Sequence, residues 1–448
     1  MFNRISRLKK YIFLACVFNL CACLCAFAQE ALPDFNKDDR VLILAPHPDD
    51  EAIACAGLIQ RALKAGAEVK VVCYTNGENN ELAFIVYEKR LTFLKGEFLH
   101  MGTVRAKETM AACRFLGMGE HNVNYMGYPD FGTMEILTKY WDTNRPFRSM
   151  FARVQKVSYQ NAMSIGAPYI GESILRDIKT ILTAFKPTRI FVSHPADTNR
   201  DHQSLYLFLH IALWDLQGRI PQPQVHPYLV HVIGWPVPRG KHPELTLKPP
   251  KELVGVSWRQ LILTDEELAN KEKSISFYKS QNASNPSYLY TFARKNELFG
   301  DFENIVLSGS DAADIKWQAA EIDQIAADAE SFLYYAVVNN ELRIRVELNK
   351  KIDKRLGLYI NLLGYSRKKS FQRMPKLEIK VGLLGMRIKD RKDFVFIRKA
   401  KLKFEGNTAL ISIPLSSLGN PDHIFARVRR RLFRVPLDLA SWRILELR

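Results

Sequence analysis

The feature that most constrains the fold is the alternation of short, continuously apolar segments with longer amphipathic ones in the N-terminal half. Residues 40–45, 69–74 and 189–193 are mostly apolar and have the length of a strand, whereas residues 172–185 show a helical apolar spacing. Continuous apolar runs are typical of strands buried on both faces, and strands that alternate with helices favour a parallel sheet. The sequence therefore predicts an α/β domain with a Rossmann-like, mostly parallel sheet flanked by helices.

The periodicity changes in the C-terminal third, where helical spacing gives way to alternation of apolar and polar residues. Short alternating segments without helices between them predict an all-β sandwich. The expected strands are residues 342–348, 376–381, 394–397 and 409–413.

The change of periodicity places a domain boundary near residue 305. We expect an α/β domain over residues 29–305, with a proline-rich excursion at 236–256, and a β-sandwich over 306–448. On this division, the first domain would fold without the second.

The first 28 residues have the pattern of a signal peptide. A basic start is followed by an apolar run from Tyr11 to Phe27, and Ala26-Phe27-Ala28 offers a small-x-small cleavage site. The pattern predicts export to the periplasm, the cell surface or the medium. An uncleaved membrane anchor is the alternative, although the run is at the lower limit for a membrane span.

Charge is concentrated at the C-terminal end. The formal net charge is +17, and residues 351–448 carry 24 Lys and Arg against 8 Asp and Glu, a difference of +16. Such a domain suits an anionic glycan or a membrane surface, and export disfavours nucleic acid. Outside the predicted signal peptide only Cys55, Cys73 and Cys113 remain. We expect them to be buried thiols, because three cysteines form no disulfide framework.

Two polar clusters follow predicted strands. His47-Pro-Asp-Asp-Glu51 comes directly after residues 40–45, and His202 begins a helix after residues 189–193. His47 and Asp50 are three residues apart, which places both side chains on one face of a helical turn. Two imidazoles and one carboxylate leave coordination positions open, as a catalytic site requires, and suit Zn²⁺ or Fe²⁺.

This residue set predicts amide hydrolysis. A metal of this kind lowers the pKa of a bound water toward about 7 and polarises a carbonyl oxygen. Asp49, adjacent to the ligand Asp50, would accept the proton of the water, and a histidine would protonate the leaving amine. The chain contains no GxGxxG, Walker, GxSxG or HExxH motif, which disfavours dinucleotide enzymes, P-loop enzymes, serine hydrolases and zincins.

The segment Ala45-Pro-His-Pro-Asp-Asp-Glu51 resembles the signature of the LmbE-like (PIG-L) zinc de-N-acetylases. Thr75-Asn-Gly-Glu78, Arg105-x-x-Glu108 with Leu116-Gly117, Gly127-Tyr-Pro-Asp130 and Asp197-x-Asn-x-Asp-His202 follow in the order of that family. The resemblance covers roughly residues 38–300. It implies His47, Asp50 and His202 as metal ligands, Asp49 as general base, and Arg105 and Asp130 near the sugar.

One departure from the family concerns the proton donor. The family commonly has a histidine three residues before the metal histidine, where this chain has Asn199. Asparagine can hydrogen-bond an oxyanion but cannot deliver a proton at neutral pH. We expect His194 or a water molecule to substitute.

The resemblance implies deacetylation of an N-acetylhexosamine-containing glycan or glycoconjugate. The alternative hypothesis is an exported glycan-binding protein that keeps the metal and has lost turnover through Asn199. In the tail, Ile413-Pro-Leu-Ser-Ser-Leu-Gly-Asn-Pro421 resembles the carbohydrate-binding sandwiches of the DOMON and family-nine type.

Overall fold

The computed structural model describes most of the chain. The described residues are 29–80, 85–87, 89, 94–320, 331–348, 356–382, 385–392, 399–432, 435–436 and 441–448. The predicted signal peptide (1–28) and the expected strand 394–397 lie outside them. No helix among the described residues is long and apolar enough to cross a membrane.

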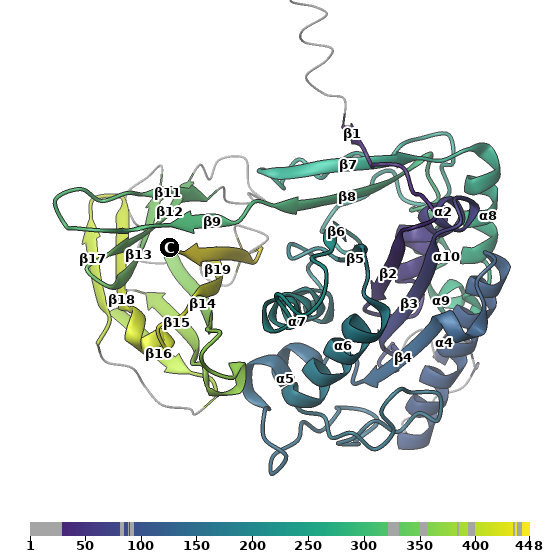
Figure 1. The fold of residues 1–448 in the computed structure, drawn as a ribbon, viewed down its shortest axis with the longest axis horizontal. Coiled ribbons are helices and arrows are strands. Elements are labelled where there is room, and N and C mark those ends of the chain that lie inside the picture. Colours follow the sequence, from purple (N-terminus) through teal and green to yellow (C-terminus); the bar gives the residue numbers. More distant parts are fainter. Residues whose placement is uncertain are drawn as a thin grey trace, which may run out of the picture.

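The N-terminal part is built on one eight-stranded sheet with the strand order β1-β7-β8-β6-β5-β2-β3-β4 (Figure 1). The neighbours β4-β3-β2-β5-β6 are all parallel, and β8 runs antiparallel to β6 and to β7. The predicted α/β fold class is therefore confirmed. The strands are β1 (Glu30–Ala31), β2 (Arg40–Ala45), β3 (Glu68–Thr75), β4 (Val123–Tyr128), β5 (Arg189–Ser193), β6 (Gln224–Tyr228), β7 (Val256–Ile262) and β8 (Asn296–Phe302).

The continuous apolar runs are explained by two hydrophobic cores, one on each face of the sheet. In β2, Val41 and Ile43 belong to one core, and the intervening Leu42 and Leu44 belong to the other. Side chains alternate between the two faces of a strand, so both faces must be apolar when both are covered.

Helices cover each core. The first core contains residues of α2, α4, α8 and α10, and the second contains residues of α5, α6 and α7. The expected helix at 265–280 is divided into α8 and α9, between which Tyr278 is fully buried and its hydroxyl donates to Glu51. The helices are α2 (Asp50–Lys64), α4 (Lys95–Phe115), α5 (Thr133–Lys139), α6 (Gly171–Phe185), α7 (Arg200–Asp215), α8 (Asp265–Ile275), α9 (Lys279–Ser284) and α10 (Pro286–Tyr290).

The C-terminal part consists of two β-sheets that enclose a third core. One sheet has the order β10-β12-β13-β18-β17, with β11 paired to β12, and the other has the order β16-β15-β14-β19-β21-β9, with β20 paired to β19. In β13, Leu342, Ile344 and Val346 belong to the third core, as the alternation predicts. The strands are β9 (Ile305–Leu307), β10 (Gly309–Ser310), β11 (Gln318–Ala320), β12 (Ser331–Val338), β13 (Glu341–Leu348), β14 (Leu356–Tyr365), β15 (Lys376–Gly382), β16 (Gly385–Asp390), β17 (Lys401–Glu405), β18 (Thr408–Pro414), β19 (His423–Leu432), β20 (Val435–Pro436) and β21 (Arg443–Leu447).

The chain passes from the first sheet to the C-terminal sheets between β8 and β9, close to the boundary expected at residue 305. The second core extends across this boundary. The folding of the two domains independently of each other stays a prediction. Six buried residues of the C-terminal part pack in the second core: Leu363, Tyr365, Phe371, Phe425, Trp442 and Ile444.

The two parts meet at α7, which lies between the parallel sheet and the strands β14 and β19 (Figure 1). The ring of Trp214 on α7 stacks on the ring of His423 with 4.3 Å between centroids. The Tyr365 hydroxyl donates to Asp215, the last residue of α7, at 3.0 Å. Apolar and polar contacts therefore join the C-terminal part to a helix that also carries His202.

Candidate metal centre

The polar clusters predicted from the sequence lie together at the carboxyl-terminal edge of the parallel strands. The strands β2 and β5 are neighbours in the sheet. The strands that follow β2 in the chain, β3 and β4, lie on one side of this pair, and β6, which follows β5, lies on the other side. Ligands in open α/β sheets bind at such a switch point. His47 and Asp50 follow β2, and His202 lies in the first turn of α7 after β5.

Three nitrogen and oxygen atoms form a compact triangle at this edge. His47 Nδ1 lies 3.2 Å from His202 Nε2 and 3.5 Å from Asp50 Oδ2, and His202 Nε2 lies 3.2 Å from Asp50 Oδ2. Two ligands at 2.0–2.1 Å from a tetrahedral zinc ion are about 3.3 Å apart. The spacing and the donor types of the three side chains thus fit a divalent ion.

The outward-facing nitrogen of each imidazole meets a buried carboxylate. His202 Nδ1 lies 3.1 Å from Asp197 Oδ2, and His47 Nε2 lies 3.2 Å from Asp130 Oδ1 and 3.5 Å from Asp201 Oδ2. Metal-binding histidines usually donate their second N–H to a carboxylate or a carbonyl, which fixes the tautomer and the ring orientation. The surroundings of both rings therefore match those of metal ligands.

The charges around the triangle favour ionised Asp50. Burial favours the neutral acid, but His202 and His47 outweigh it and hold the pKa of Asp50 well below its usual value. Burial also disfavours the charged imidazoles, yet Asp197 and Asp50 raise the pKa of His202 to about 9. Asp130 contributes most to holding the pKa of His47 above its ordinary value against the same effect of burial.

Asp49 lies beside this triangle and is held by Arg105. Arg105 Nη2 donates to Asp49 Oδ2 at 3.0 Å, and the guanidinium also donates to the main-chain oxygens of Pro48 and Gly77 at 2.7 Å. A Cβ atom at Gly77 would collide with Arg105, which explains the glycine in this motif. Burial raises the pKa of Asp49 to about 7 although Arg105 opposes the shift. A carboxylate with this pKa suits a proton acceptor near neutral pH.

A cavity of 310 Å³ opens next to the triangle. Pockets for small ligands start at about 300 Å³, so the cavity suits a small group such as one sugar ring. Its wall contains both neutral hydrogen-bonding side chains and less polar ones. The lining includes the polar residues Asn79, Asn80, Asn199, Gln281, Ser284 and Asn285 and the less polar Ile53, Phe131, Val230, Tyr288 and Leu289.

Most residues predicted for the site are brought together by the fold. His47, Asp49, Asp50, Arg105, Asp130 and Asn199 line the cavity, and His202 belongs to the triangle. Asp130 lies behind His47, and its Oδ2 accepts from the main-chain N–H of Asn79 at 3.0 Å. Asn199 caps α7, because its side-chain oxygen accepts from Asp201 N at 2.8 Å.

His194 is not among the lining residues of the cavity. It is fully buried between Trp258 and Phe302, and its Nδ1 accepts from Ala196 N at 3.0 Å. Burial, assisted by Arg443, lowers the pKa of His194 to about 3. The position of His194 therefore does not support the predicted role as proton donor.

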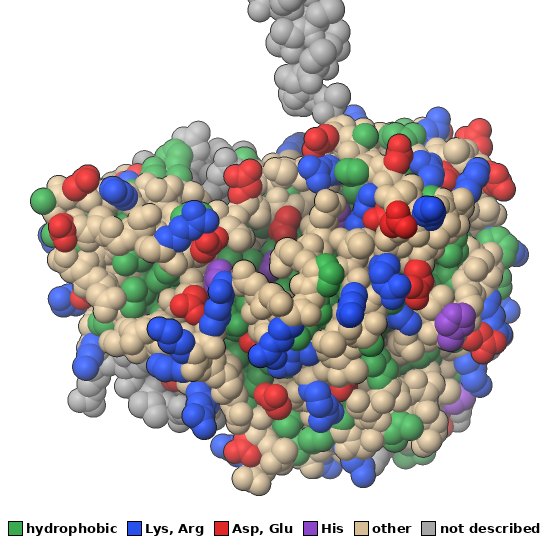
Figure 2. All heavy atoms as spheres, viewed as in Figure 1, with side chains coloured by type: hydrophobic (Ala, Val, Ile, Leu, Met, Phe, Trp, Pro, Cys, Tyr) green, Lys and Arg blue, Asp and Glu red, His purple; other side chains and the backbone are tan. Residues whose placement is uncertain are grey.

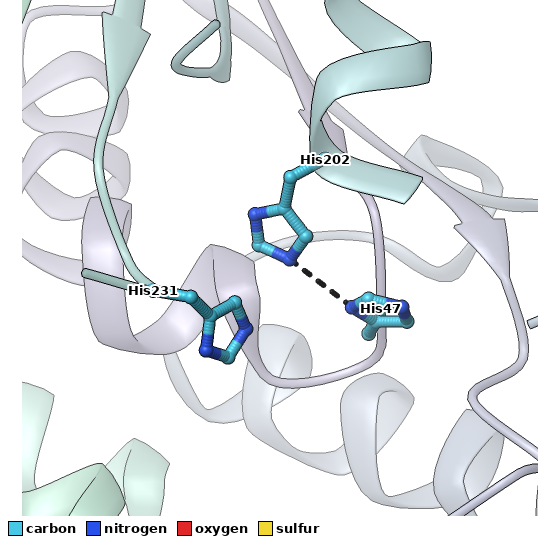
Figure 3. Close-up of side chains that lie close together, drawn as sticks. All are labelled: His47, His202 and His231. Carbon is cyan, nitrogen blue, oxygen red and sulfur yellow. Dashed lines mark hydrogen bonds between the residues drawn. The ribbon is translucent and has the colours of Figure 1, made fainter. Parts of the chain in front are cut away.

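His231, which follows β6, lines the cavity, whereas His194 does not. Figure 3 shows His47, His202 and His231 converging from three separate segments. One ring nitrogen of each lies within 4.8 Å of the others. The Nδ1 of His231 lies 2.7 Å from the hydroxyl of Tyr288. Burial lowers the pKa of His231 to about 4.

The sequence interpretation missed His231 because it did not recognise β6. The signal was the short apolar run around His226-Pro-Tyr-Leu-Val230, directly before His231. Asp197 and Asp201 belong to the motif Asp197-x-Asn-x-Asp-His202, and the structure places their carboxylates beside His202 and His47. The prediction of buried thiols is confirmed, since Cys55, Cys73 and Cys113 are all buried and unpaired.

Comparison with known proteins supports the resemblance in the region of the site. Residues 42–213 match the family described as GlcNAc-PI de-N-acetylase (PIG-L). The resemblance to PIG-L is thus confirmed for this segment. The segment contains every residue of the predicted site, while His231 and the C-terminal sheets lie beyond it.

Curated relatives match shorter stretches. The 1D-myo-inositol 2-acetamido-2-deoxy-alpha-D-glucopyranoside deacetylase of Salinispora arenicola is 34% identical over 106 residues, which are 22% of this chain and 32% of the relative. The protein of the same name from Mycobacterium avium is 36% identical over 81 residues, 18% of this chain and 26% of the relative. The chain thus spans about a third or less of the length of these relatives.

Solved structures that match the chain include proteins described as deacetylases and one described as a 4-carboxy-2-hydroxymuconate hydratase. The A40926 pseudoaglycone deacetylase Dbv21 is 14% identical, with 58% of this chain and 96% of that chain covered and a TM-score of 0.37. The N,N'-diacetylchitobiose deacetylase from Pyrococcus horikoshii is 19% identical, with 55% and 72% covered and a TM-score of 0.33.

Proposed function

We propose that this protein hydrolyses the N-acetyl group of an N-acetylhexosamine-containing glycan or glycoconjugate in a metal-dependent reaction. The observation that carries the proposal is the triangle of His47, Asp50 and His202, with donor atoms 3.2–3.5 Å apart beside Asp49. The match of residues 42–213 to PIG-L and the names of the curated relatives support the reaction class.

The proposed ligands are His47, Asp50 and His202, and the proposed ion is Zn²⁺, with Fe²⁺ as the alternative. When bound, such an ion supplies Lewis-acid polarisation of a carbonyl oxygen and acidifies water. The three side chains would leave at least one tetrahedral position open for these tasks.

The remaining residues have roles that follow from their positions. The Asp49 carboxylate, oriented by Arg105, would accept the proton of the attacking water. Asn199 and the amide side chains of the cavity wall would hydrogen-bond the amide oxygen and the sugar hydroxyls. Among the described residues that line the cavity, the negatively charged ones are those around the triangle, which suits a neutral sugar.

An acetate-release screen tests the proposal. The purified chain would be incubated with N-acetylglucosamine oligomers, peptidoglycan fragments and small N-acetylglucosaminides, with and without added Zn²⁺ or Fe²⁺. The matched control is Asp49→Asn, which keeps the size of the side chain and one acceptor oxygen but removes the base. Release that depends on metal and on Asp49 supports the proposal. Binding of a glycan without acetate release from any compound in the screen would favour the non-catalytic alternative.

We further propose that the protein is exported and that the C-terminal sheets bind sugar or an anionic surface. The support is the sequence pattern of residues 1–28 and the charge of residues 351–448. On the face shown in Figure 2, Lys and Arg side chains are spread over both parts of the molecule rather than gathered over the β-sheets. Fractionation of cells, and a salt series of binding to anionic polysaccharide and to anionic vesicles, test these two points.

A further inference from the structure

The buried side chain of Trp442, directly before β21, connects the C-terminal part to the segment that carries the candidate metal centre. Its indole Nε1 donates to Gln203 Oε1 at 3.3 Å, and its main-chain N–H donates to the Pro195 oxygen at 3.2 Å. Trp442 is 3% exposed, and Gln203 is fully buried. Both acceptors belong to the segment that joins β5 to the first turn of α7 and contains His202.

Gln203 continues the connection toward His202. Its Nε2 donates to the main-chain oxygen of Asp197 at 2.6 Å. The Asp197 carboxylate in turn lies 3.1 Å from His202 Nδ1 and accepts the main-chain N–H of His231 at 2.8 Å. A buried amide with a partner at each end is held in one orientation, because losing either hydrogen bond would leave a polar group unsatisfied.

We propose that Trp442 is a positioning residue for the metal centre. Through Gln203 it holds the Asp197 segment, and Asp197 fixes the ring orientation of His202. The inference rests on the proposed function, since it assumes that His202 binds an ion. Partners beyond the direct ligands commonly set metal affinity by orienting the ligating imidazole. The C-terminal part then contributes to the site as well as to the shared core.

The same interface offers a matched control at the far end of α7. The Tyr365 hydroxyl, also from the C-terminal part, donates to Asp215 at 3.0 Å. Asp215 is the last residue of α7, on the order of 20 Å along the helix from His202 at about 1.5 Å per residue. Trp442→Phe and Tyr365→Phe each remove one donor from the same interface and keep an aromatic ring.

The experiment measures Zn²⁺ affinity of the full-length chain by competition with a chromophoric chelator, and the visible absorption spectrum of the Co²⁺-loaded chain. We expect Trp442→Phe to weaken Zn²⁺ binding about tenfold, the lower end of the effect of outer partners, and to shift the cobalt spectrum. Tyr365→Phe should leave both unchanged. Gln203→Met interrupts the connection at its middle and should match or exceed the effect of Trp442→Phe.

The double variant Trp442→Phe/Gln203→Met should bind Zn²⁺ no more weakly than Gln203→Met alone, because both changes break one connection. Unchanged affinity and spectrum in both single variants would overturn the inference. Equal losses in Trp442→Phe and Tyr365→Phe would overturn it too, since the interface would then act only through stability. Failure of the unsubstituted chain to bind Zn²⁺ or Co²⁺ would contradict the proposed function instead.

Discussion

The buried carboxylates of the candidate metal centre and the buried Lys376 of the C-terminal part are stabilised in different ways. In the α/β part, Asp50, Asp130, Asp197 and Asp201 are buried around two imidazoles, so the charges converge on one point. In the C-terminal part, the Lys376 ammonium is fully buried but donates to the main-chain oxygens of Phe371 and Met374 at 2.7 Å. Convergence on a common centre indicates a ligand site, whereas satisfaction by the main chain indicates a structural role.

The candidate metal ligands are also distributed unequally between the two parts. Among the described residues, every group of three His, Cys, Asp or Glu side chains spaced to hold an ion lies in the α/β part and includes His47. Packing is shared more evenly, because the second core takes residues from both parts. The candidate ligands therefore lie in one part of the molecule, whereas residues of both parts form the core that supports them.

Removal of one imidazole of the triangle is expected to have the largest effect on the α/β part. His47→Ala and His202→Ala should each lose the bound ion and all metal-dependent activity, because two remaining donors hold a divalent ion poorly. Elemental analysis of the purified variants measures the loss against about one ion per unsubstituted chain. If both variants keep full occupancy, the proposed ligands are wrong.

The next largest effect is expected from substitution of the proposed general base, Asp49. Asp49→Asn should keep the ion and lose roughly 10²- to 10⁴-fold in turnover, the usual contribution of a positioned general base. Metal content and acetate release on the same preparation check the two halves of this outcome. A variant that loses the ion would show instead that Asp49 is a ligand.

Removal of the C-terminal part tests the sharing of the core. A chain that ends at residue 305 would uncover the part of the second core that Phe425, Trp442 and Ile444 cover. Each large apolar side chain contributes about 1.5–3 kcal/mol when buried, so the melting temperature should fall by at least about 10 °C, or the chain should aggregate. Scanning calorimetry of both forms measures the difference. An equal melting temperature would show that the two parts are independent, as the change of periodicity had suggested.

The smallest effect concerns His194 and the pH dependence of stability. The pKa of His194 is lowered to about 3 in the folded chain and is about 6.5 in the unfolded chain. The contribution of His194 to the free energy of unfolding is therefore fully present above pH 6.5 and is lost as the pH falls toward 3. Between pH 7 and pH 5 the loss should be roughly 2 kcal/mol. His194→Asn keeps an acceptor for Ala196 N and should remove this part of the slope. Denaturant unfolding at several pH values measures it.

The same variant tests the earlier prediction about the proton donor. Because His194 stacks on Trp258 and does not line the cavity, His194→Asn should leave turnover per folded molecule unchanged. A large loss of turnover at constant metal content would restore His194 as a participant.

The sequence by itself predicted the fold class and the centre of the site. Strands such as β2 are buried on both faces, so their composition reveals a covered sheet without reference to the rest of the chain. The residue types and their positions directly after predicted strands indicated His47, Asp50 and His202, and the pairing of β2 with β5 brings the two polar clusters together. The alternation in β13 likewise revealed a strand with one apolar face.

Only the tertiary structure decided which other residues share the site. His194 precedes His202 by eight positions, yet its ring packs between Trp258 of β7 and Phe302 of β8, far along the chain. His231 enters because β6 lies beside β5, and Trp442 reaches Gln203 because the second core closes over α7. Local patterns report which face of an element is buried and how a turn begins. The side chains that meet at one point are selected by long-range packing, which no local spacing records.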